Sequence, residues 1–339
     1  MKKQCILVTG GAGFIGSHTC IALHEAGYKV IIVDNFSNSH RDVLSRLNQI
    51  LNTDIIFYEG DVRDQIFLAK IFKNHAIHAV IHFAGFKAVG ESVKKPLDYY
   101  DNNILSMICL LRVMKEARVY ILIFSSSATV YGDPKWLPIK EDSERYTTSP
   151  YGRSKLFIEH LLEDLYHAEP HWNIALLRYF NPVGAHDSGL IGELPNDVPN
   201  NLMPFVQQVA KGLQPYLSVF GNDYDTRDGT GIRDYIHVMD LAEGHVSALN
   251  YYQTNHGLLT VNLGTGQGTS VLDLVNTFEK INNCKVQYKI VERRSGDIAA
   301  CWADVSFAER ALAWRAKRDL AKMCEDAWRW ECARTSLRV

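Results

Sequence analysis

The sequence predicts an α/β protein with a doubly wound parallel sheet and a smaller C-terminal α+β domain. In the first half of the chain, short runs of β-branched and aliphatic residues alternate with longer stretches that have helical spacing. Continuous apolar runs are typical of strands buried on both faces, and their alternation with helices is typical of a parallel sheet. After about Asn181, proline, glycine and asparagine become frequent, which indicates a second, looser domain.

The elements of the sheet follow in order along the chain. The first helix is predicted over Phe14–Ala26, because its apolar residues share one face and Gly27 follows as a stop. The apolar runs that predict strands are Cys5–Thr9, Lys29–Asp34, Ile55–Tyr58, Ala79–Phe83, Tyr120–Ser125 and Ile174–Tyr179. Later helical patterns cover Met239–Tyr251, Val271–Asn282 and Asp319–Trp330. We therefore expect domains at 1–180 and 181–339, with some of the chain crossing back.

The turn after the first strand carries glycines at three-residue spacing, Gly10, Gly13 and Gly16. In a dinucleotide-binding turn, the first glycine allows a sharp bend, the second lets the backbone approach a pyrophosphate, and the third lets the helix pack on the strand. The free N–H groups and the macrodipole of the following helix favour an anion there. A glycine turn alone is weak support, but the strand before it and the helix after it predict a Rossmann-type nucleotide site.

An acidic residue at the end of the second strand refines this prediction. The Asp34 carboxylate would accept hydrogen bonds from the adenosine ribose and repel a 2′-phosphate, which favours NAD over NADP. Asp61 follows the third strand and would either hydrogen-bond the adenine or cap the next helix.

The candidate catalytic pair is Tyr151 and Lys155, which are four residues apart and share one face of a predicted helix. A free tyrosine has a pKa of about 10 and is a poor base, but a neighbouring ammonium stabilises the phenolate. Tyr151 would then remove a proton from an alcohol, while Lys155 tunes it and holds the cofactor ribose. The serines of Ser125–Ser127 end the fifth strand, at the sheet edge where ligands bind. One of them can hydrogen-bond the reacting oxygen.

Together, the glycine turn, the serine strand end and the Tyr-x-x-x-Lys pair resemble the extended short-chain dehydrogenase/reductases. Within that group the chain is most similar to the UDP-glucose 4-epimerase family, and the similarity covers nearly the whole chain. Specific stretches that carry it are His82–Ser92, Leu177–Ala185 and Gly229–Val238.

The resemblance implies NAD as the cofactor and a UDP-hexose as the substrate. It implies Tyr151 as the base, Lys155 as its tuner and Ser127 as the hydroxyl partner. The implied NAD residues are Gly10, Gly13, Phe14, Ile15, Gly16, Asp34, Asn35, Asp61, Val62, Phe83, Ala84, Gly85, Lys87, Asn102, Ser125, Tyr151, Lys155 and Phe180. The implied UDP-sugar residues are Ser127, Tyr151, Asn181, Asn201, Phe220, Arg233, Arg294, Asp297 and Cys301. Arginines suit a diphosphate because a guanidinium matches its oxygens in a bidentate fork.

The implied reaction is inversion at sugar C4 through a 4-keto intermediate. Two alternatives stay open at this point. A nucleotide-sugar 4,6-dehydratase of the same group would carry an Asp-Glu pair just after the strand-end serine, where this chain has Ala128 and Thr129; neither is a general acid at neutral pH. A non-catalytic dinucleotide-binding protein would keep the fold without the chemistry, and the intact Tyr151–Lys155 pair argues against it.

Composition excludes several other classes of function. The net charge of −2 argues against a nucleic-acid or membrane-surface footprint. The seven cysteines include no Cys-x-x-Cys pair, which predicts free thiols in a reducing compartment. No apolar run approaches the roughly 18 residues of a membrane helix, so we expect a cytoplasmic protein. His167 and His171 have metal-like spacing, but Pro170 interrupts the helix and no third ligand is evident, so we expect no metal.

Two further expectations follow from the resemblance. The patterns at Pro96–Val113 and Tyr151–His167 resemble the helices with which this family builds a four-helix interface, which predicts a homodimer. The residue at position 301 borders the hexose in this family. Cys301 is small and would leave room beside the sugar, which predicts activity on UDP-N-acetylglucosamine and UDP-N-acetylgalactosamine as well.

Overall fold

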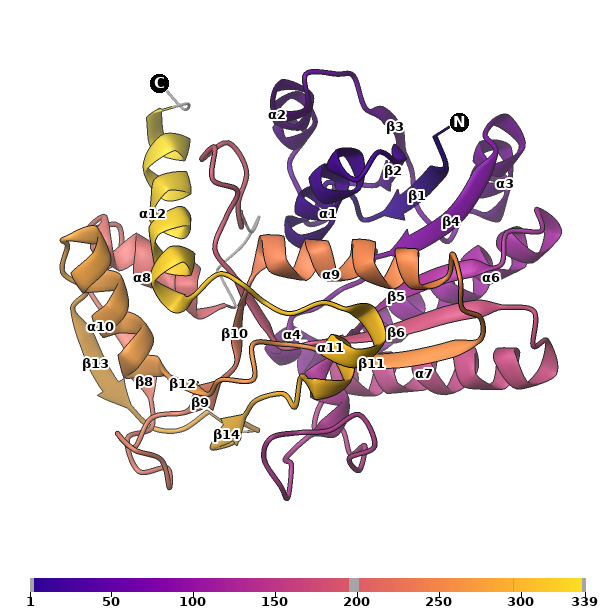
Figure 1. The fold of residues 1–339 in the computed structure, drawn as a ribbon. Helices are drawn as coiled ribbons and strands as arrows, with labels where there is room; N and C mark the ends of the chain where they lie inside the picture. Colours follow the sequence, from indigo (N-terminus) through magenta and orange to yellow (C-terminus); the bar gives the residue numbers. More distant parts are fainter. Residues whose placement is uncertain (1–2, 195–200, 295, 337–339) are drawn as a thin grey trace.

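The computed structural model describes residues 3–194, 201–294 and 296–336. Its centre is a seven-stranded parallel sheet with the strand order β11-β6-β5-β4-β1-β2-β3 (Figure 1). The order runs outward from β1 in both directions, which is the doubly wound arrangement predicted from the sequence. The strands are β1 (Cys5–Thr9), β2 (Lys29–Asp34), β3 (Ile56–Glu59), β4 (Ile77–His82), β5 (Ile121–Ser127), β6 (Asn173–Tyr179) and β11 (Leu258–Leu263).

The sheet is apolar on both faces because successive residues of each strand enter different cores. In β1, Ile6 and Val8 belong to one buried cluster, while Leu7 belongs to the cluster on the opposite face. In β2, Ile32 and Ile31 divide in the same way. Helices therefore have to cover both faces, since neither can be left to water.

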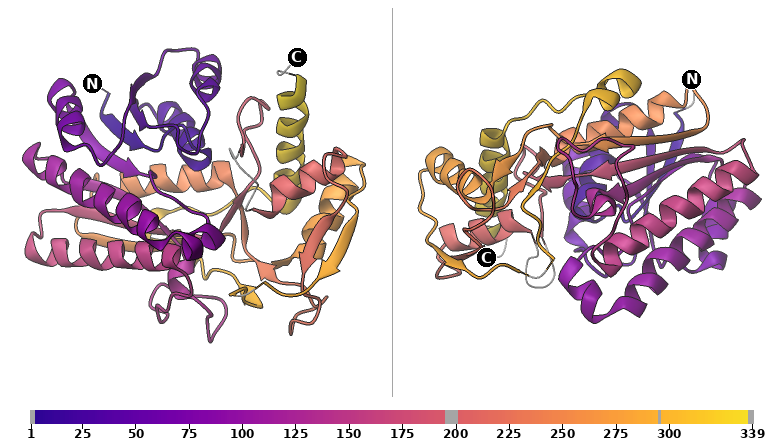
Figure 2. Two further views of the ribbon diagram at one scale, coloured as in Figure 1. Left: turned by 180° about the vertical axis from the view of Figure 1, so that it is seen from behind. Right: turned by 90° about the horizontal axis from the view of Figure 1, so that it is seen from below.

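The helices form two layers, one on each side of the sheet (Figures 1 and 2). One layer contains α1 (Phe14–Glu25), α2 (Asp42–Leu51), α9 (Val238–Tyr251) and α11 (Ser306–Leu312). The other contains α3 (Gln65–Asn74), α6 (Ser106–Glu116) and α7 (Pro150–Ala168). Shorter segments connect the strands to these layers: α4 (Val89–Lys94), α5 (Pro96–Tyr100), the π-helix η1 (Asp101–Leu105) and the 3-10 helix η2 (Ala128–Tyr131).

The rest of the chain builds a smaller lobe beside the carboxyl edge of the sheet (Figure 1). Its buried core includes Met203, Leu274 and Phe278. Its helices are α8 (Leu202–Ala210), α10 (Val271–Asn282) and α12 (Leu320–Ser336). Its short strands are β7 (Asn181–Val183), β8 (Leu217–Phe220), β9 (Ile232–Arg233), β10 (Tyr235–His237), β12 (Thr269–Ser270), β13 (Tyr288–Val291) and β14 (Ala300–Cys301).

The fold class and the six strands predicted from apolar runs are confirmed, with ends that move by up to two residues. The sequence analysis missed β11, which pairs in parallel with β6 and completes the sheet. Its run Leu258–Leu263 lies in the part of the chain that we placed in the second domain, and α9 from the same part packs on α1. The boundary at residues 180 and 181 stays a prediction. After it, the chain returns to the large sheet twice, first with α9 and β11 and then with α11.

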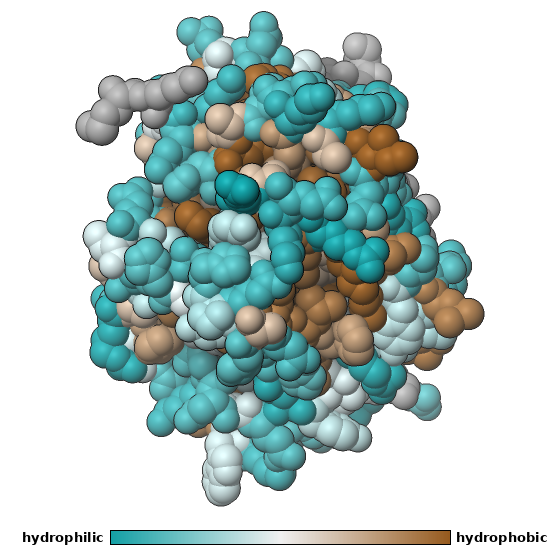
Figure 3. Space-filling model, turned by 90° about the vertical axis from the view of Figure 1, so that its right-hand side faces the viewer, coloured by the Kyte–Doolittle hydropathy of each residue, from teal (hydrophilic) through white to brown (hydrophobic). Residues whose placement is uncertain are grey.

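The surface farthest from the smaller lobe is covered mainly by hydrophilic side chains, and hydrophobic ones reach it in a band near its middle (Figure 3). Within residues 3–194, 201–294 and 296–336, no helix combines the length and the apolar character needed to cross a bilayer.

Candidate active site

The carboxyl ends of the central strands open into a cavity of about 330 Å³ between the sheet and the smaller lobe. Ligands of doubly wound proteins bind at this edge, where the strand order reverses. The cavity wall includes the glycine turn after β1, the end of β2, the end of β5 and the first turns of α7. The smaller lobe adds Asn181, Pro182, Glu193 and Asn201.

The glycine turn has the close approaches that its sequence predicts. Gly10 has φ +71°, and a Cβ placed on it would lie 2.7 Å from the Ala84 backbone nitrogen. A Cβ on Gly16 would lie 2.2 Å from the Gly10 carbonyl oxygen. A Cβ on Gly13 would meet only that carbonyl oxygen, at 3.2 Å. Gly13 caps α1 without a side-chain hydrogen bond, so the helix N-terminus presents its backbone N–H groups at the cavity wall.

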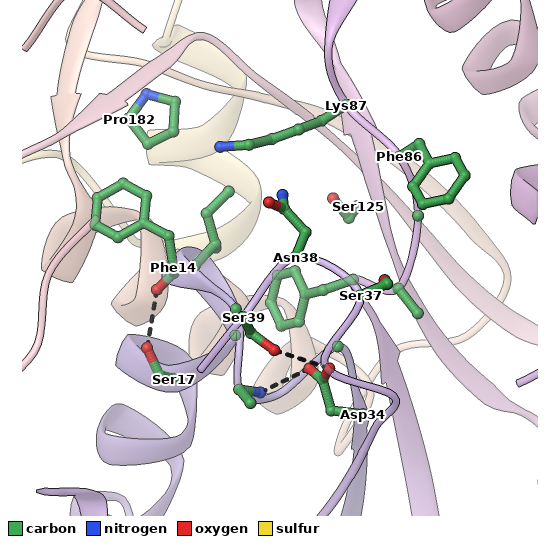
Figure 4. A pocket seen from close by; sticks show the side chains of 18 of the residues that line it. Phe14, Ser17, Asp34, Ser37, Asn38, Ser39, Phe86, Lys87, Ser125 and Pro182 are labelled. Atoms are coloured by element: carbon green, nitrogen blue, oxygen red, sulfur yellow. Dashed lines mark hydrogen bonds between the residues drawn. The ribbon is translucent and has the colours of Figure 1, made fainter. Parts of the chain in front are cut away.

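Asp34 is held in place by three donors at the end of β2. Its carboxylate accepts hydrogen bonds from the Ala12 nitrogen at 3.0 Å, the Phe36 nitrogen at 2.9 Å and the Ser39 hydroxyl at 3.0 Å. The bond from Ser39 can be seen in Figure 4. Burial raises the pKa of this carboxyl, and these hydrogen bonds oppose the increase. A carboxylate has about four acceptor sites, so Asp34 keeps capacity for a further donor in the cavity.

Asp61 lines the cavity and does not cap the helix that follows it. The N-cap of α3 is Asp64, whose side chain accepts a hydrogen bond from the Phe67 nitrogen. Hydrogen bonds from Arg63 hold the pKa of Asp61 below its usual value, and Asn35 donates to the same carboxylate at 3.3 Å. The helix-cap interpretation of Asp61 is therefore wrong, and its hydrogen bond to the adenine stays a prediction.

Lys87 points into the cavity (Figure 4) and is paired with an acidic residue that the sequence analysis missed. Its Nζ lies 3.1 Å from the Glu193 Oε1, and the Asn201 side chain donates to the same oxygen at 2.6 Å. Glu193 thus joins a residue predicted to contact NAD to one predicted to contact the UDP-sugar. Its sequence context, in a stretch rich in proline and glycine, contains no signal that would have identified it.

The predicted catalytic residues converge where β5 meets α7. The helix begins at a Ser149 cap, which accepts from the Gly152 nitrogen, and Pro150 stands in its first turn. Lys155 donates from its Nζ to the Ser125 carbonyl oxygen at 2.7 Å and lies over the Phe124 ring. Burial lowers the pKa of Lys155 to about 8.

The environment of Tyr151 differs from the one expected from the sequence. Burial raises the pKa of its phenol, and a hydrogen bond with the Ser127 side chain is the interaction that lowers it. Ser127 also accepts from the Thr129 hydroxyl at 2.9 Å and from the Thr129 nitrogen at 3.2 Å. Direct tuning of Tyr151 by Lys155 therefore stays a prediction.

All residues implied by the resemblance for NAD line this one cavity, and so do Ser127, Asn181 and Asn201. The π-helix η1 contributes Asn102, an irregularity that is frequent at functional sites. The cavity also includes Ser37, Asn38, Ser39 and His40 from the loop after β2. The sequence analysis missed these four, although their cluster of serine and asparagine directly after Asp34 was a usable signal.

The remaining sugar-binding candidates lie outside the cavity lining. The Arg294 guanidinium lies 4.6 Å from the centre of the Phe220 ring, and its Nε is 2.9 Å from the Asp297 carboxylate. Arg233 and Cys301 are paired in register on β9 and β14. Among the residues with described positions, no group of three or more His, Cys, Asp or Glu side chains is arranged to hold a metal ion.

Comparisons with known proteins identify the family to which the chain belongs. A family model described as GDP-mannose 4,6 dehydratase matches residues 7–327. The UDP-glucose 4-epimerases of Haemophilus influenzae and Bacillus subtilis are 57% and 54% identical to the chain, each over 97% of both sequences. The chain belongs to the UDP-glucose 4-epimerase family. Its relatives thus favour epimerases over the dehydratase for which the broader family model is named.

Solved structures agree with this assignment to the epimerase family. The UDP-glucose 4-epimerase of Stenotrophomonas maltophila, solved with NAD and formylated UDP-arabinopyranose, has a TM-score of 0.97 and 50% identity, covering 98% of this chain and 99% of that one. The Bifidobacterium longum epimerase, solved with NAD+ and UDP, has a TM-score of 0.95 and 52% identity, over 98% and 99% of the two chains. The fold is therefore that of the UDP-glucose 4-epimerases.

Substitutions in the glycine turn test the geometry directly. Gly16→Ala places a methyl group against backbone, so we expect a loss of about 1–3 kcal/mol in the free energy of unfolding. Gly13→Ala should fold nearly as well as the wild type, because its Cβ has only one close neighbour. Gly90→Ala is the control, since nothing lies within 4 Å of its Cβ position. Chemical denaturation measures all three, and equal stability of Gly16→Ala and Gly90→Ala would contradict the assigned packing.

Proposed function

We propose that this member of the UDP-glucose 4-epimerase family interconverts UDP-glucose and UDP-galactose with bound NAD. The observation that carries the proposal is a single cavity in which Tyr151, hydrogen-bonded to Ser127, shares a wall with the glycine turn and Asp34. The phenol supplies a group for proton transfer, and the turn with its acidic neighbour supplies a dinucleotide site. Inverting a carbon that bears a hydroxyl group requires the proton-transfer group and the dinucleotide site to lie side by side.

The residues present fit NAD. Gly13 leaves the approach to the α1 N-terminus open, where backbone N–H groups favour a pyrophosphate. The buried Asp34 carboxylate suits ribose hydroxyls and repels the extra phosphate of NADP. NAD, when bound, accepts hydrogen from sugar C4 as hydride and returns it later in the same turnover.

The side chains of the site handle the proton and the substrate. Tyr151 takes the proton of the sugar 4-hydroxyl and gives it back when the 4-keto sugar is reduced, with Ser127 hydrogen-bonded to the same oxygen. Lys155 holds the cofactor ribose and supplies positive charge. Asn181, Asn201, Phe220 and Asp297 contact the UDP-sugar. Arg233 and Arg294 clamp its diphosphate, which stays anchored while the keto sugar turns over.

The segment after β5 supports epimerisation over 4,6-dehydration. Eliminating water across C5 and C6 needs an additional acid and base next to the strand-end serine. Ala128 and Thr129 occupy those positions in η2, and the Thr129 hydroxyl is already bonded to Ser127. Neither side chain supplies the missing groups.

Removing the phenol oxygen tests the assigned base. We expect Tyr151→Phe to lose about 10²–10⁴-fold in kcat while it still binds NAD and UDP, because the ring remains and only the proton carrier is lost. Tyr146→Phe is the matched control, since Tyr146 is 68% exposed. Turnover of UDP-galactose and the content of bound cofactor measure both variants. Near-wild-type turnover of Tyr151→Phe would refute the mechanism.

We also propose that the chain forms a homodimer through α7 and the segment from α5 to α6. These helices are neighbours, and they expose large apolar side chains: Leu97 is 79% exposed, Phe157 52% and Leu105 39%. Such side chains are suited to burial against a second copy related by a two-fold axis.

Charged substitutions on this helix pair test the interface. Leu97→Glu combined with Phe157→Glu should give a monomer in light scattering at micromolar concentration. A two-fold interface would bury two copies of each unpaired carboxylate, and burying unpaired charge is costly. Ile66→Glu, at a position that is 71% exposed on α3, should leave the dimer intact. A monomeric wild type, or a dimeric double variant, would contradict the proposal.

We extend the proposal to N-acetylated substrates on the basis of Cys301. The thiol is buried in a small cluster with Val130, Tyr131, Ile139, Phe180 and Ala303, and Phe180 lines the cavity. Cys301 itself does not line the cavity, so it would act on the sugar through the cluster that it shares with Phe180. Because the residue at position 301 is small, the cavity wall can shift enough to accommodate an N-acetyl group on the sugar.

Enlarging this residue should therefore narrow the substrate range. We expect Cys301→Tyr to lower kcat/KM for UDP-N-acetylgalactosamine by about tenfold, within the 1–3 kcal/mol typical of overpacking, while UDP-galactose turnover changes much less. Cys301→Ser is the control because it preserves volume. If the wild type does not turn over N-acetylated sugars while it converts UDP-galactose readily, the extension fails.

We propose a reducing compartment such as the cytoplasm as the place of action. None of the seven cysteines, all of which lie among the described residues, forms a disulfide, and five of them are buried. Proteins with this pattern are typical of compartments that keep thiols reduced.

A further inference from the structure

Behind the catalytic residues, a fully buried ion pair joins α7 to the sheet. Glu159 on α7 and Arg178 on β6 have side chains that are 0% and 3% exposed. Arg178 donates from Nε to one Glu159 oxygen at 2.9 Å and from a terminal nitrogen to the other at 2.8 Å. This is the bidentate fork that fixes orientation as well as distance.

The pair is the centre of a longer hydrogen-bonded network. Arg178 also donates to the Tyr131 hydroxyl and to the Glu141 carbonyl, both at 2.8 Å. Tyr131 donates to the Asn262 side chain at 2.6 Å. The network therefore connects α7 and β6 with η2 and with β11, the strand that the chain adds last.

This network reaches the catalytic strand end through Ser126, which donates to Glu159. Ser126 stands between Ser125, whose carbonyl holds Lys155, and Ser127, which is bonded to Tyr151. Glu159 lies one turn beyond Lys155 on the same face of α7. One carboxylate thus contacts the central residue of the serine strand end from the helix that carries the base.

Stability alone is a poor explanation for such a pair. Burying two charges removes their hydration, and apolar residues of similar volume are often as stabilising. What a bidentate buried pair adds is one defined arrangement of the two elements that carry it. Here those elements are α7, with Tyr151 and Lys155, and the sheet, with the serine strand end.

We propose that Glu159 and Arg178 are positioning residues for the proton transfer: together they set the register of α7 against β5, and the Glu159 carboxylate supplies negative charge one helical turn from Lys155. The proposal rests on the epimerase function proposed above. It assigns roles to two residues that do not line the cavity and that act through Lys155, Ser126 and Tyr131.

The charges around Lys155 determine the sign of the expected effect. Burial lowers the pKa of Lys155 to about 8, and Glu159 is the charged group that raises it. His82 on β4 faces Lys155 but is neutral, since burial lowers its pKa to about 3. Burial also keeps Tyr151 and Tyr179 uncharged in this environment by raising the pKa of each phenol.

The groups facing Glu159 complete this set of charges. Arg178 is joined by Arg145, which donates to Glu159 at 3.2 Å and whose side chain is 27% exposed. Tyr131 contacts Arg178, and burial raises the pKa of its phenol. Glu159 thus has two cations as neighbours apart from Lys155, and losing either leaves its charge less balanced.

Breaking the pair from its two ends should shift the pH profile in opposite directions. Glu159→Gln removes the carboxylate and leaves the Arg178 charge, so Lys155 loses its proton at lower pH and the alkaline limb of kcat/KM moves down. Arg178→Met keeps the carboxylate, held by Arg145 and Ser126, so the alkaline limb moves up. We expect about half a pH unit or more in each direction, with kcat lowered about tenfold in both variants.

The experiment measures kcat/KM for UDP-galactose against pH in the holoenzyme. Arg145→Gln is a milder variant with the same expected direction as Arg178→Met, so the result does not depend on the folding of the buried variants. Asp240→Asn is the control: its side chain is 0% exposed and paired with Arg318 on the opposite face of the sheet. It should lower the melting temperature without moving the pH profile.

Opposite shifts in the two sets of variants support the proposal. Shifts in the same direction, or a profile unchanged in every variant that folds, would overturn it and leave the pair a purely structural feature. A wild-type protein with no epimerase activity would instead refute the proposed function. Melting curves and bound-cofactor content separate a shift in proton transfer from a loss of folded protein.

Discussion

The structure of the site depends on the contact between α7 and the end of β5. The Lys155 Nζ donates to the Ser125 carbonyl, and Tyr151 meets the Ser127 side chain two residues further along the strand. These two contacts align the helix with the strand end and place the phenol at the cavity wall. The glycine turn and Asp34 come to the same wall because parallel strands end at one edge of the sheet.

That alignment places charged groups in a buried environment, and the structure compensates each of them. Lys155 has a backbone carbonyl and an aromatic ring beside it, and Glu159 has a bidentate arginine. At the mouth of the cavity, Glu193 neutralises Lys87 and accepts from Asn201. The two lysines that line the cavity, Lys87 and Lys155, therefore each have a partner within the protein itself.

Local pattern predicted most of this architecture. The strands β1 and β2 are continuous apolar runs, and the turn between β1 and α1 has glycines at a specific spacing. Both patterns lie within short segments of the chain, so they can be identified from the sequence. The strand β11 could not be assigned to the sheet, because its apolar run does not show which neighbour it pairs with. Asp61 and Asp64 both fit a helix cap in the sequence, and only the observed bond from the Phe67 nitrogen identifies Asp64. Glu193 and the Glu159–Arg178 pair depend on contacts between distant segments, which no spacing along the chain contains.

The most direct test of the account is the product that the wild-type protein makes from UDP-galactose. Incubation followed by mass spectrometry and sugar analysis distinguishes the two chemistries of the wider family, because epimerisation leaves the mass unchanged and dehydration removes one water. We expect UDP-glucose of unchanged mass, with NAD released when the protein is denatured. A product lighter by one water, or recovery of unaltered UDP-galactose from protein that holds NAD, would contradict it.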